Sequence, residues 1–339
     1  MKVLRLHKPL DFRFHDEPVP EYGSDEVLVK IGSTGVCASD VHYYRHGKIG
    51  EQVPKEPHIL GHESSGVVAA VGADVKTLKV GDRVALEPSK SCGHCEMCKQ
   101  GYINICPNVQ FFGTPPFQGT LREYIAWRAD LCIPIPDNMT LDEAAIVEPL
   151  AVGMYAVQLA EMKGGESVTI LGSGAIGLSV LQAAKLEGAS KLIVVDPVPE
   201  RRAIAKKLGA DIVLDSAGST QHIIDETGGT DLVFECAGSP DAVRQTAYVL
   251  RPKGKIMIIG IPDEDSYCFD ASVSRRRELT VQFVRRSRNL VEKCIELISE
   301  GKIDAASMAT HVFSFDETED AFKLAMEKRD GVVRAMIHM

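Results

Sequence analysis

Hydrophobic positions follow different patterns in the two halves of the chain. In the first half, short apolar runs lie between Gly- and Pro-containing turns, as in "EVLVKIGSTGV" (26–36), "GVVAAVGADV" (66–75), "GDRVALEP" (81–88) and "TLREYIAWRADL" (120–131). Runs of this length, bounded by turn residues, predict strands. Helical periodicity is scarce there, so we expect a β-rich barrel or sandwich.

From about Ala151 onward, apolar strands alternate with amphipathic helices. "SVTIL" (167–171) predicts a strand, "AIGLSVLQAAKLEG" (175–188) a helix and "KLIVVD" (191–196) a second strand. The alternation continues through a helix predicted over 241–254 to a strand at "KIMIIG" (255–260). Fully apolar strands that alternate with helices are typical of a doubly wound parallel sheet. After about residue 285 two more amphipathic helices and a short final strand are predicted.

Length and composition restrict the class of protein. The 339 residues suit two domains, and 45% hydrophobic with 25% charged residues is usual for soluble proteins. A net charge of −9 argues against nucleic-acid binding. The first residues lack a signal-peptide core, and runs such as "LIVVD" are too short to cross a bilayer. We therefore expect a cytoplasmic protein with neither nucleic-acid nor membrane partners.

A glycine motif lies at the first turn of the predicted parallel sheet. "LGSGAIG" matches G-x-G-x-x-G at Gly172, Gly174 and Gly177, between a strand and a helix that opens with Ala175 and Ile176. In that context the first glycine permits the tight turn, the second lets backbone approach a pyrophosphate, and the third lets helix pack on strand. The N–H groups at the helix start would face the phosphates of a dinucleotide.

Asp196 ends the next predicted strand, nineteen residues after Gly177. A carboxylate there can accept hydrogen bonds from the adenosine ribose and would repel a 2′-phosphate, which favours NAD over NADP. The alternative is that Asp196 merely opens a turn before Pro197. Arg201 and Arg202 keep NADP open, because either could neutralise a 2′-phosphate.

A dense cysteine cluster has the pattern C-x2-C-x2-C-x7-C, formed by Cys92, Cys95, Cys98 and Cys106. Four thiolates fill the tetrahedral shell of Zn²⁺ and leave no position for a substrate, so we predict a structural zinc site. An iron–sulfur cluster is the alternative. Nine cysteines in a long chain argue against a disulfide scaffold. Four further cysteines are expected to be small buried apolar side chains, namely Cys132, Cys236, Cys268 and Cys294.

A second possible ligand set is scattered along the first half of the chain. It consists of Cys37, His62, Glu63 and Glu148. One thiolate, one imidazole and one or two carboxylates would suit a catalytic zinc with an open position. Taken singly, each could equally be an ordinary core residue.

With these motifs in place, the chain resembles the zinc-dependent medium-chain alcohol dehydrogenases, and among them the sorbitol and xylitol (polyol) dehydrogenase branch. "GHESSGVV", "VGDRVALEP", the four-Cys loop, "EPLAVG" and "GSGAIG" occur in family order and spacing. The resemblance implies an α/β protein whose GroES-like catalytic domain is discontinuous, residues 1–150 plus 285–339. A Rossmann domain, 151–284, is inserted between its two parts.

The resemblance also implies roles for the ligand sets. Cys37, His62 and Glu63 would hold the catalytic zinc, with Glu148 binding it directly or through water. The four-Cys loop would hold a second, structural zinc, giving two per subunit. Zinc would make the alcohol oxygen more acidic, and NAD would accept hydride.

The family pattern further implies a proton relay and substrate contacts. Ser39 would take the alcohol proton and pass it through the nicotinamide ribose to His42, although His42 could also be an ordinary solvent-facing imidazole. Tyr43, Phe111 and Thr114 would line the polyol pocket.

An arginine cluster departs from the family pattern. Arg286 keeps the family's arginine and is expected to contact the substrate, but both aromatic neighbours are replaced, by Arg285 and Ser287. Six arginines fall between residues 275 and 288, which predicts either a solvated or subunit-facing surface or a site for an anionic group such as a sugar-alcohol phosphate.

Other functions remain open on the sequence alone. A threonine or other amino-alcohol dehydrogenase is the nearest alternative, although Glu148 in "EPLAVG" favours the polyol branch. A zinc-free quinone reductase would not retain both ligand sets, and a non-catalytic scaffold would show degraded ligands or a broken glycine motif. Family members are usually dimers or tetramers, so we expect a homodimer or homotetramer.

Overall fold

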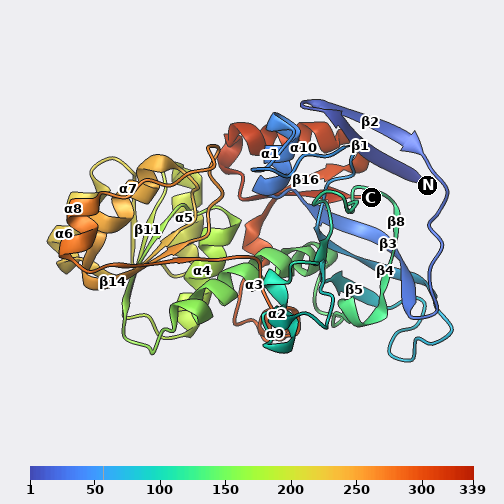
Figure 1. Ribbon diagram of the computed structural model, residues 1–339, viewed down its shortest axis with the longest axis horizontal. Coiled ribbons are helices and arrows are strands. Elements are labelled where there is room, and N and C mark those ends of the chain that lie inside the picture. The colour runs from blue at the N-terminus through green and yellow to red at the C-terminus, as the bar shows by residue number, and fades with distance from the viewer. Residues whose placement is uncertain (56) are drawn as a thin grey trace. The chain divides into compact units, whose positions relative to one another are not determined.

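The computed structural model describes residues 1–55 and 57–339. The chain forms two units, Met1–Glu148 together with Val291–Met339, and Pro149–Leu290 (Figure 1). These boundaries lie a few residues from those expected from the sequence. Each unit is described separately below.

The first unit is built on a seven-stranded sheet with the order β16-β17-β3-β4-β5-β9, and β8 pairs with β3 (Figure 1). β16 and β17 run parallel, whereas the other neighbours are antiparallel. Alternate residues of β3, including Val27, Val29 and Ile31, pack with Ile125 and Trp127 in one core. This period of two is what the half-buried strands of an antiparallel sheet require, so the predicted β-rich architecture is confirmed. The strands are β3 (Glu26–Gly35), β4 (Glu63–Val71), β5 (Arg83–Leu86), β8 (Tyr124–Arg128), β9 (Cys132–Pro134), β16 (Ala309–Ser314) and β17 (Arg334–His338).

Smaller elements surround this sheet. A hairpin packs on two helices through aromatic contacts, in which Phe12 stacks on Tyr44 and meets Phe322 edge-on. A short two-stranded ribbon flanks the cysteine cluster. The hairpin and ribbon strands are β1 (Lys2–Lys8), β2 (Asp11–Asp16), β6 (Ser89–Lys90) and β7 (Gln110–Phe111). The helices are α1 (Ala38–His46), α2 (Glu96–Lys99), α9 (Val291–Ser299) and α10 (Thr318–Glu327), and short 3-10 turns are η1 (Ile103–Ile105), η2 (Ala129–Leu131), η3 (Ala306–Met308), η4 (Phe315–Glu317) and η5 (Arg329–Gly331).

The second unit is a six-stranded sheet with the order β12-β11-β10-β13-β14-β15, and all of its neighbouring strands are parallel. From β10 the chain moves outward to β12, then returns to β13 on the other side of β10. The topological switch point, where such sheets bind ligands, is therefore between β10 and β13. Its strands are β10 (Ser167–Leu171), β11 (Lys191–Val195), β12 (Ile212–Leu214), β13 (Thr230–Glu235), β14 (Leu250–Ile258) and β15 (Thr280–Phe283); its helices are α4 (Ala175–Leu186), α5 (Pro199–Leu208), α6 (Ser219–Thr227), α7 (Pro240–Val249) and α8 (Ala271–Arg276).

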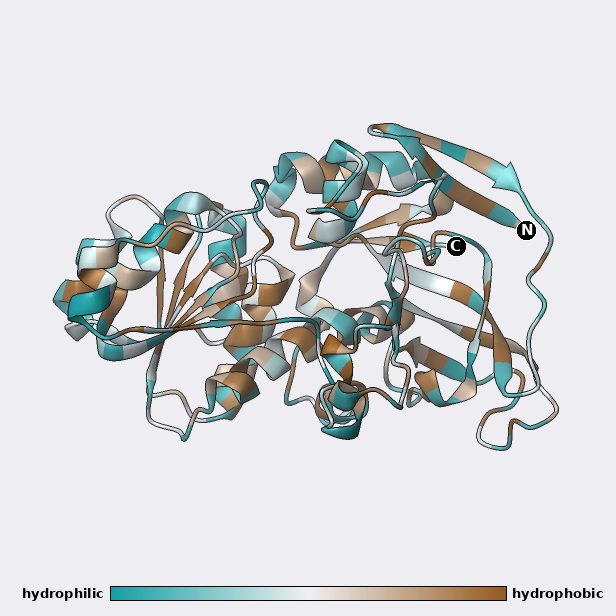
Figure 2. Ribbon diagram, in the orientation of Figure 1, coloured by the Kyte–Doolittle hydropathy of each residue, from teal (hydrophilic) through white to brown (hydrophobic). Residues whose placement is uncertain are grey.

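The central strands of this sheet are buried on both faces. Val168, Ile170, Val194, Val233 and Phe234 are fully inaccessible to solvent. Figure 2 shows the hydrophobic colour running along these strands. Burial on both faces explains why the strands appear in the sequence as continuous apolar runs, and the predicted doubly wound sheet is confirmed.

Helix α3 (Leu141–Ala160) carries the boundary between the units, since Pro149 lies inside it. It is the one helix of the described residues that is long and apolar enough to cross a membrane. The apolar runs considered from the sequence were shorter than this helix. However, 78% of its most apolar window is buried in the fold, as in the core helix of a globular protein.

Two secondary-structure predictions are wrong. The predicted helix over 241–254 ends at Val249, and Leu250 already starts β14. The first half also contains α1 and the first half of α3, where we expected few helices. α3 is apolar on nearly every side, so its sequence has little of the amphipathic period that indicates a helix.

Candidate metal centres and dinucleotide site

Three of the four scattered ligand candidates lie together in the first unit. One ligand atom each from Cys37, His62 and Glu63 lies within 4.8 Å of the other two. Cys37 precedes α1 in extended conformation, and His62 and Glu63 stand at the start of β4. β3 leads into Cys37 and pairs antiparallel with β4, with Gly35 opposite Glu63. The pairing of β3 with β4 thus brings Cys37 close to His62 and Glu63, which are distant from it in the sequence.

Asp40 orients His62, although the sequence analysis did not select it. Its Oδ2 lies 3.3 Å from Nδ1 of His62, and its Oδ1 accepts a hydrogen bond from the Gly61 N–H at 3.2 Å. This contact leaves Nε2 of His62 for a metal, as in carboxylate–histidine–metal groups. Burial disfavours a charged ring, but the charges of Asp40 and Cys37 outweigh it and hold the pKa of His62 well above its usual value. The negative charges around His62 therefore favour a positive charge at this site.

Glu63 forms a buried ion pair with Arg334, another residue that the sequence analysis missed. Arg334 Nη2 lies 2.9 Å from Glu63 Oε1, and the two side chains are 5% and 1% exposed. Apart from this ion pair, neither carboxylate oxygen of Glu63 has a hydrogen-bond partner among the described residues. Burial raises the pKa of Glu63, while Arg334 acts in the opposite direction. A buried carboxylate with unsatisfied oxygens fits a bound cation.

Glu148 lies outside the group of three but acts on it electrostatically. It is buried on α3. Burial raises the pKa of Glu148 to about 7; the charge of His62 opposes this shift and that of Glu63 adds to it. An acid-rich set of S, N and O donor atoms is what a zinc ion with an open position requires. The residues of this site therefore fit zinc.

Ser39 and His42, the predicted proton relay, both lie on α1. The Ser39 hydroxyl donates a hydrogen bond to Sγ of Cys37 at 3.3 Å, which places it beside the ligand group. His42 lies one helical turn further along, with its ring centroid 6.0 Å from that of His46. Their role as a relay stays a prediction.

The predicted substrate contacts occupy different environments. The Phe111 ring lies 5.3 Å from that of His62, and the Thr114 N–H donates to the Phe111 carbonyl at 3.2 Å. Tyr43 is on α1 and its side chain is buried in the core against which this helix packs; its hydroxyl donates to Gln52 Oε1 at 3.3 Å. Phe111 is thus adjacent to the ligand group.

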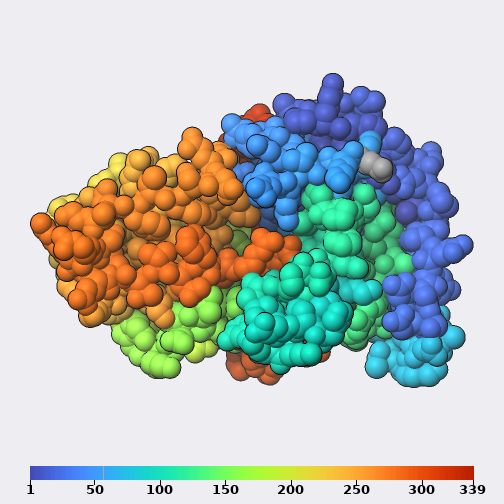
Figure 3. Space-filling view, in the orientation of Figure 1, coloured from blue at the N-terminus to red at the C-terminus, as the bar shows by residue number. Residues whose placement is uncertain are grey.

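The four-cysteine loop brings its sulfurs together as predicted for a metal shell. All four Sγ atoms lie within 4.8 Å of one another, and the loop forms the teal segment near residue 100 in Figure 3. Cys92 and Cys98 are 4.0 Å apart and Cys95 and Cys106 are 3.8 Å apart, too far for disulfides. Backbone N–H groups of His94 and Cys95 lower the pKa of Cys92 to about 6. Clustered sulfurs with a readily formed thiolate fit Zn²⁺.

The remaining cysteines do not all behave as expected. Cys132 and Cys294 are buried and Cys236 is half-buried, but Cys268 is exposed. The prediction that Cys268 is a buried apolar side chain is wrong, because it lies in the loop between β14 and α8 rather than in a strand.

The glycine motif opens the helix after β10. Gly172 has φ of 94°, and a Cβ there would lie 2.9 Å from the Ala237 N. Gly174 is the N-cap of α4. A Cβ on Gly177 would lie 1.8 Å from the Gly172 carbonyl oxygen. Gly172 and Gly177 therefore each meet a steric requirement of a dinucleotide-binding turn, while Gly174 caps the helix whose first turn contains Ala175 and Ile176.

Asp196 connects the end of β11 to this turn. Its Oδ2 accepts from the Ser173 N–H at 2.7 Å, and its Oδ1 accepts from the Val198 N–H at 2.8 Å. Arg202 donates to the Asp196 carbonyl and pairs with Asp215 at 3.2 Å. Arg201 lies near the glycine motif instead: its Nη1 is 4.0 Å from the position that a Cβ would occupy on Gly174.

The arginine cluster is partly structural. Arg277 Nη1 donates to the carbonyls of Ala247 and Tyr248 at 2.9 Å, at the end of α7. Arg288 lies over the Tyr155 ring at 5.6 Å. Arg286 is half-buried with φ of 53° and belongs to the second unit. Its substrate contact stays a prediction.

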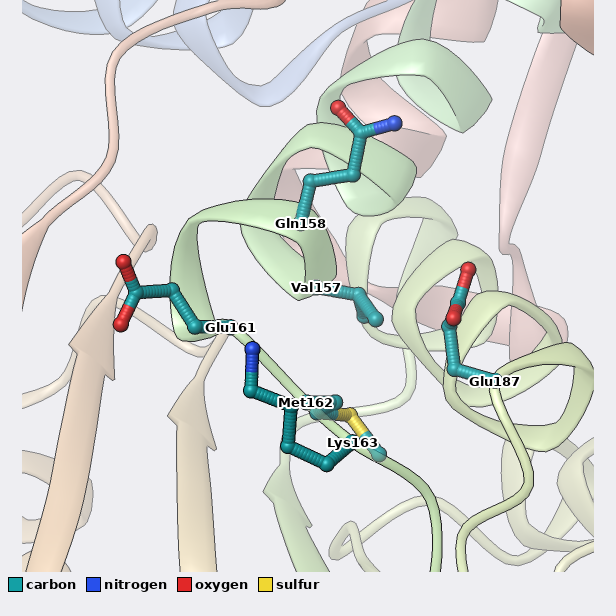
Figure 4. A pocket seen from close by; sticks show the side chains of 6 residues that line it. All are labelled: Val157, Gln158, Glu161, Met162, Lys163 and Glu187. Atoms are coloured by element: carbon teal, nitrogen blue, oxygen red, sulfur yellow. The ribbon is translucent and has the colours of Figure 1, made fainter.

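A hollow in the second unit contains none of the predicted site residues. It is formed at the ends of α3 and α4 and is lined by Val157, Gln158, Glu161, Met162, Lys163 and Glu187 (Figure 4). Its lining offers neither a metal-ligand set nor a glycine turn. The chemistry is therefore assigned to the buried ligand group and the glycine motif, not to this hollow.

A nucleotide-type parallel sheet together with a buried zinc-ligand set defines a metal-dependent dehydrogenase. Comparisons with known proteins agree. The family models described as "Alcohol dehydrogenase GroES-like domain" and "Zinc-binding dehydrogenase" match residues 23–137 and 175–300. The chain belongs to the zinc-dependent medium-chain alcohol dehydrogenase family, and its cofactors are zinc and NAD(P).

Individual relatives match along nearly the whole chain. A sorbitol dehydrogenase of Bacillus subtilis is 37% identical, covering 100% of this chain and 97% of that protein. A probable D-xylulose reductase A of Aspergillus clavatus is 39% identical, covering 92% and 89%. The crystal structure of an Escherichia coli oxidoreductase of unknown specificity has a TM-score of 0.94 and 38% identity, covering 99% and 98%. Two further structures, from Sinorhizobium meliloti and E. coli, hold NADP and NADH; each has a TM-score of 0.91 and covers 100% of this chain and 99% of its own, at 29% and 27% identity.

Proposed function

We propose that this protein is an NAD-dependent zinc dehydrogenase that oxidises a secondary alcohol of a polyol, such as sorbitol or xylitol, to the ketose. The observation that carries the proposal is the convergence of a half-buried Cys37 with the buried His62 and Glu63 in one acid-rich group. Relatives named sorbitol dehydrogenase and D-xylulose reductase, at 37% and 39% identity, support the substrate class.

In this proposal Cys37, His62 and Glu63 hold the catalytic zinc, and Glu148 contributes directly or through water. Bound zinc supplies a Lewis acid that lowers the pKa of an alcohol hydroxyl. Asp40 keeps His62 in the tautomer that presents Nε2, and Arg334 balances the charge of Glu63. A carboxylate at position 148, where classical relatives carry a thiolate, would donate less electron density to a bound zinc and so leave it the stronger Lewis acid.

Ser39 is proposed to accept the proton of the alcohol, since its hydroxyl lies next to Cys37. His42, on the same helix, would then hold the proton and release it to solvent. Phe111, beside His62, would form an apolar wall of the substrate pocket, with Thr114, Tyr43 and Arg286 as further contacts. These assignments rest on the family resemblance and on the neighbourhood described above.

For the dinucleotide, NAD is proposed over NADP. The proposed contacts are Gly172, Gly174, Ala175, Ile176, Gly177, Asp196 and Arg201. Asp196 places a carboxylate at the end of β11, where a 2′-phosphate would be repelled. Arg202 is already paired with Asp215, so it is less available to a phosphate. NAD supplies the hydride acceptor at C4 of its nicotinamide.

The four-cysteine loop is proposed to hold a structural zinc, which brings the total to two zinc ions per subunit. The four thiolates of Cys92, Cys95, Cys98 and Cys106 would leave no coordination position open for substrate. The site would therefore stabilise the loop rather than take part in the reaction.

We also propose a homodimer or homotetramer located in the cytoplasm. β15 is an edge strand of the parallel sheet, and all four of its residues are exposed, including Val281 at 38% and Phe283 at 55%. An uncovered edge with exposed apolar side chains is a typical pairing surface. Sedimentation of a Phe283→Glu variant tests this: it should shift toward monomer, whereas unchanged assembly would contradict pairing at β15.

The experiment that tests the activity is a substrate panel with NAD and NADP, each with and without a chelator. Sorbitol or xylitol should be the better substrates, and chelation should abolish turnover. Preference for threonine would favour an amino-alcohol dehydrogenase. Higher kcat/KM for a sugar-alcohol phosphate than for its neutral counterpart would favour phosphate recognition by the arginine cluster. Absence of turnover with every one of these substrates would contradict the proposal.

A further inference from the structure

His58 is a buried histidine of the first unit that none of the roles assigned above uses. It precedes the ligand residue His62 by four positions, and its exposed fraction is 2%. Its backbone pairs with Leu6 of β1: the Leu6 N–H donates to the His58 carbonyl at 2.8 Å, and the His58 N–H donates to the Leu6 carbonyl at 2.9 Å. Because β1 fixes its backbone, the direction of the His58 side chain is determined by the fold.

The ring of His58 holds the turn formed by residues 111–114 (the 111–114 turn). Its Nε2 donates a hydrogen bond to the Gly113 carbonyl at 3.1 Å. A carbonyl only accepts, and burial favours the neutral ring, so the imidazole carries its proton on Nε2. Gly113 is buried, and loss of this donor would therefore deprive its carbonyl oxygen of a hydrogen bond at a place away from water.

The 111–114 turn lies against the zinc-ligand group. The Phe111 ring is 5.3 Å from the ring of His62. A Cβ on Gly113, which has φ of 67°, would lie 3.2 Å from the nitrogen and the oxygen of Gly61, the residue before His62. The same position would be 3.5 Å from Oδ1 of Asp40, which orients His62. The hydrogen bond from His58 therefore sets how closely the turn approaches the ligand group.

The two sides of the 111–114 turn are held by different contacts. Phe112 is 2% exposed and packs on Trp127 in the core of the sheet, with ring centroids 4.2 Å apart. This apolar contact fixes the side of the turn that faces the core. On the other side, Gly113 has no side chain to pack, and Thr114 is half-buried. His58 supplies the side-chain hydrogen bond that fixes this second side.

We propose that His58 is a positioning residue of the substrate pocket, and that by fixing the 111–114 turn it favours a polyol over a short secondary alcohol. The inference rests on the proposed function, in which Phe111 and Thr114 contact the substrate. A polyol extends beyond the carbon that is oxidised, so its remaining chain needs a pocket wall at a defined distance from the metal. A short alcohol such as propan-2-ol has little chain beyond that carbon and depends less on where the turn lies.

The test compares the steady-state kinetics of the zinc-loaded wild type, His58→Leu and His58→Gln with sorbitol, xylitol and propan-2-ol at saturating NAD⁺. Leucine fills the site but has no donor, whereas glutamine keeps an N–H at a similar distance from the backbone. We expect His58→Leu to raise the KM for the polyol roughly tenfold and to change kcat for the polyol, and kcat/KM for propan-2-ol, by less than about twofold. His58→Gln should restore most of the affinity for the polyol. If His58→Leu does not fold, His58→Asn takes its place, because its shorter amide does not reach Gly113.

Trp127, the one tryptophan of the sequence, provides a readout that needs no turnover. Its ring packs on Phe112 and is 9% exposed, so acrylamide quenching of its fluorescence reports whether the core side of the turn stays packed. Quenching should be the same in His58→Leu as in the wild type, because only the hydrogen bond at Gly113 is removed. His15→Leu is the matched control: it removes a histidine of β2 whose ring contacts His7, and it should change neither the quenching nor the kinetic constants.

Three results would overturn the inference. The first is a KM for the polyol that the leucine substitution leaves unchanged, and the second is an equal loss of kcat/KM for the polyol and for propan-2-ol. The third is increased quenching of Trp127, because His58 would then stabilise the core as a whole rather than position one side of the pocket. A wild type that oxidises no polyol would instead contradict the proposed function.

Discussion

Replacement of Arg334 by methionine isolates the energetic role of the ion pair behind the catalytic ligand group. Methionine has similar length and is apolar, so the change removes the charge without opening a large cavity. It leaves Glu63 buried, 1% exposed, without its guanidinium partner. It also removes the hydrogen bond from Arg334 Nη1 to the Val36 carbonyl, which measures 2.6 Å.

The expected loss is large because both partners are buried. Removal of one member of a buried ion pair costs about 3–5 kcal/mol, since the remaining charge stays desolvated. For a domain of 150–250 residues, each kcal/mol corresponds to roughly 2–4 °C in Tm. The variant should therefore unfold roughly 6–20 °C below the wild type in the metal-free protein.

Urea unfolding and thermal unfolding, both without metal, provide the assay. The matched control is Arg329→Met, which breaks the surface pair with Glu327, whose partners are 57% and 49% exposed. Exposed pairs contribute about 0–1 kcal/mol, so the control should lie close to the wild type. If Arg334→Met loses no more stability than Arg329→Met, then the buried pair does not compensate Glu63 and the reasoning is refuted.

Three further predictions test other parts of the protein. Gly177→Ala should abolish dinucleotide binding in calorimetry, with a stability loss of about 1–3 kcal/mol, because the new Cβ would lie 1.8 Å from the Gly172 oxygen; normal binding would contradict the assigned turn. Cys95→Ser should lower the metal content from two zinc ions per subunit to one and reduce stability or assembly; a fully folded variant that is only inactive would mean that the two zinc roles are reversed. His58 is buried and lies 3.1 Å from the Gly113 oxygen through Nε2, and burial lowers its pKa below 6.5. The stability that neutral His58 contributes is present above pH 6.5 and is lost as the pH falls toward the folded-state pKa. The free energy of unfolding in urea should therefore decrease less at acid pH for His58→Gln than for the wild type. Parallel profiles of unfolding free energy against pH would exclude this linkage.

The sequence by itself determined the local chemistry. Gly172, Gly174 and Gly177 lie between an apolar strand and a helix, and only backbone geometry is needed to predict their turn. The four-cysteine loop is equally local, because fifteen consecutive residues contain every sulfur of the cluster. The alternation of strands and helices likewise predicted the parallel sheet, since buried strands must be apolar on both faces.

Only the tertiary structure decided which residues stand behind those motifs. Arg334 lies 271 positions after Glu63 in the chain, and the two are brought together because β3 pairs with β17 on one side and with β4 on the other. Asp40 has no distinctive pattern until α1 places it against His62. Glu235 resembles any strand-ending acid until burial leaves one of its oxygens without a partner. Charge compensation and burial depend on contacts between distant segments, and a one-dimensional pattern of residue types does not contain those contacts.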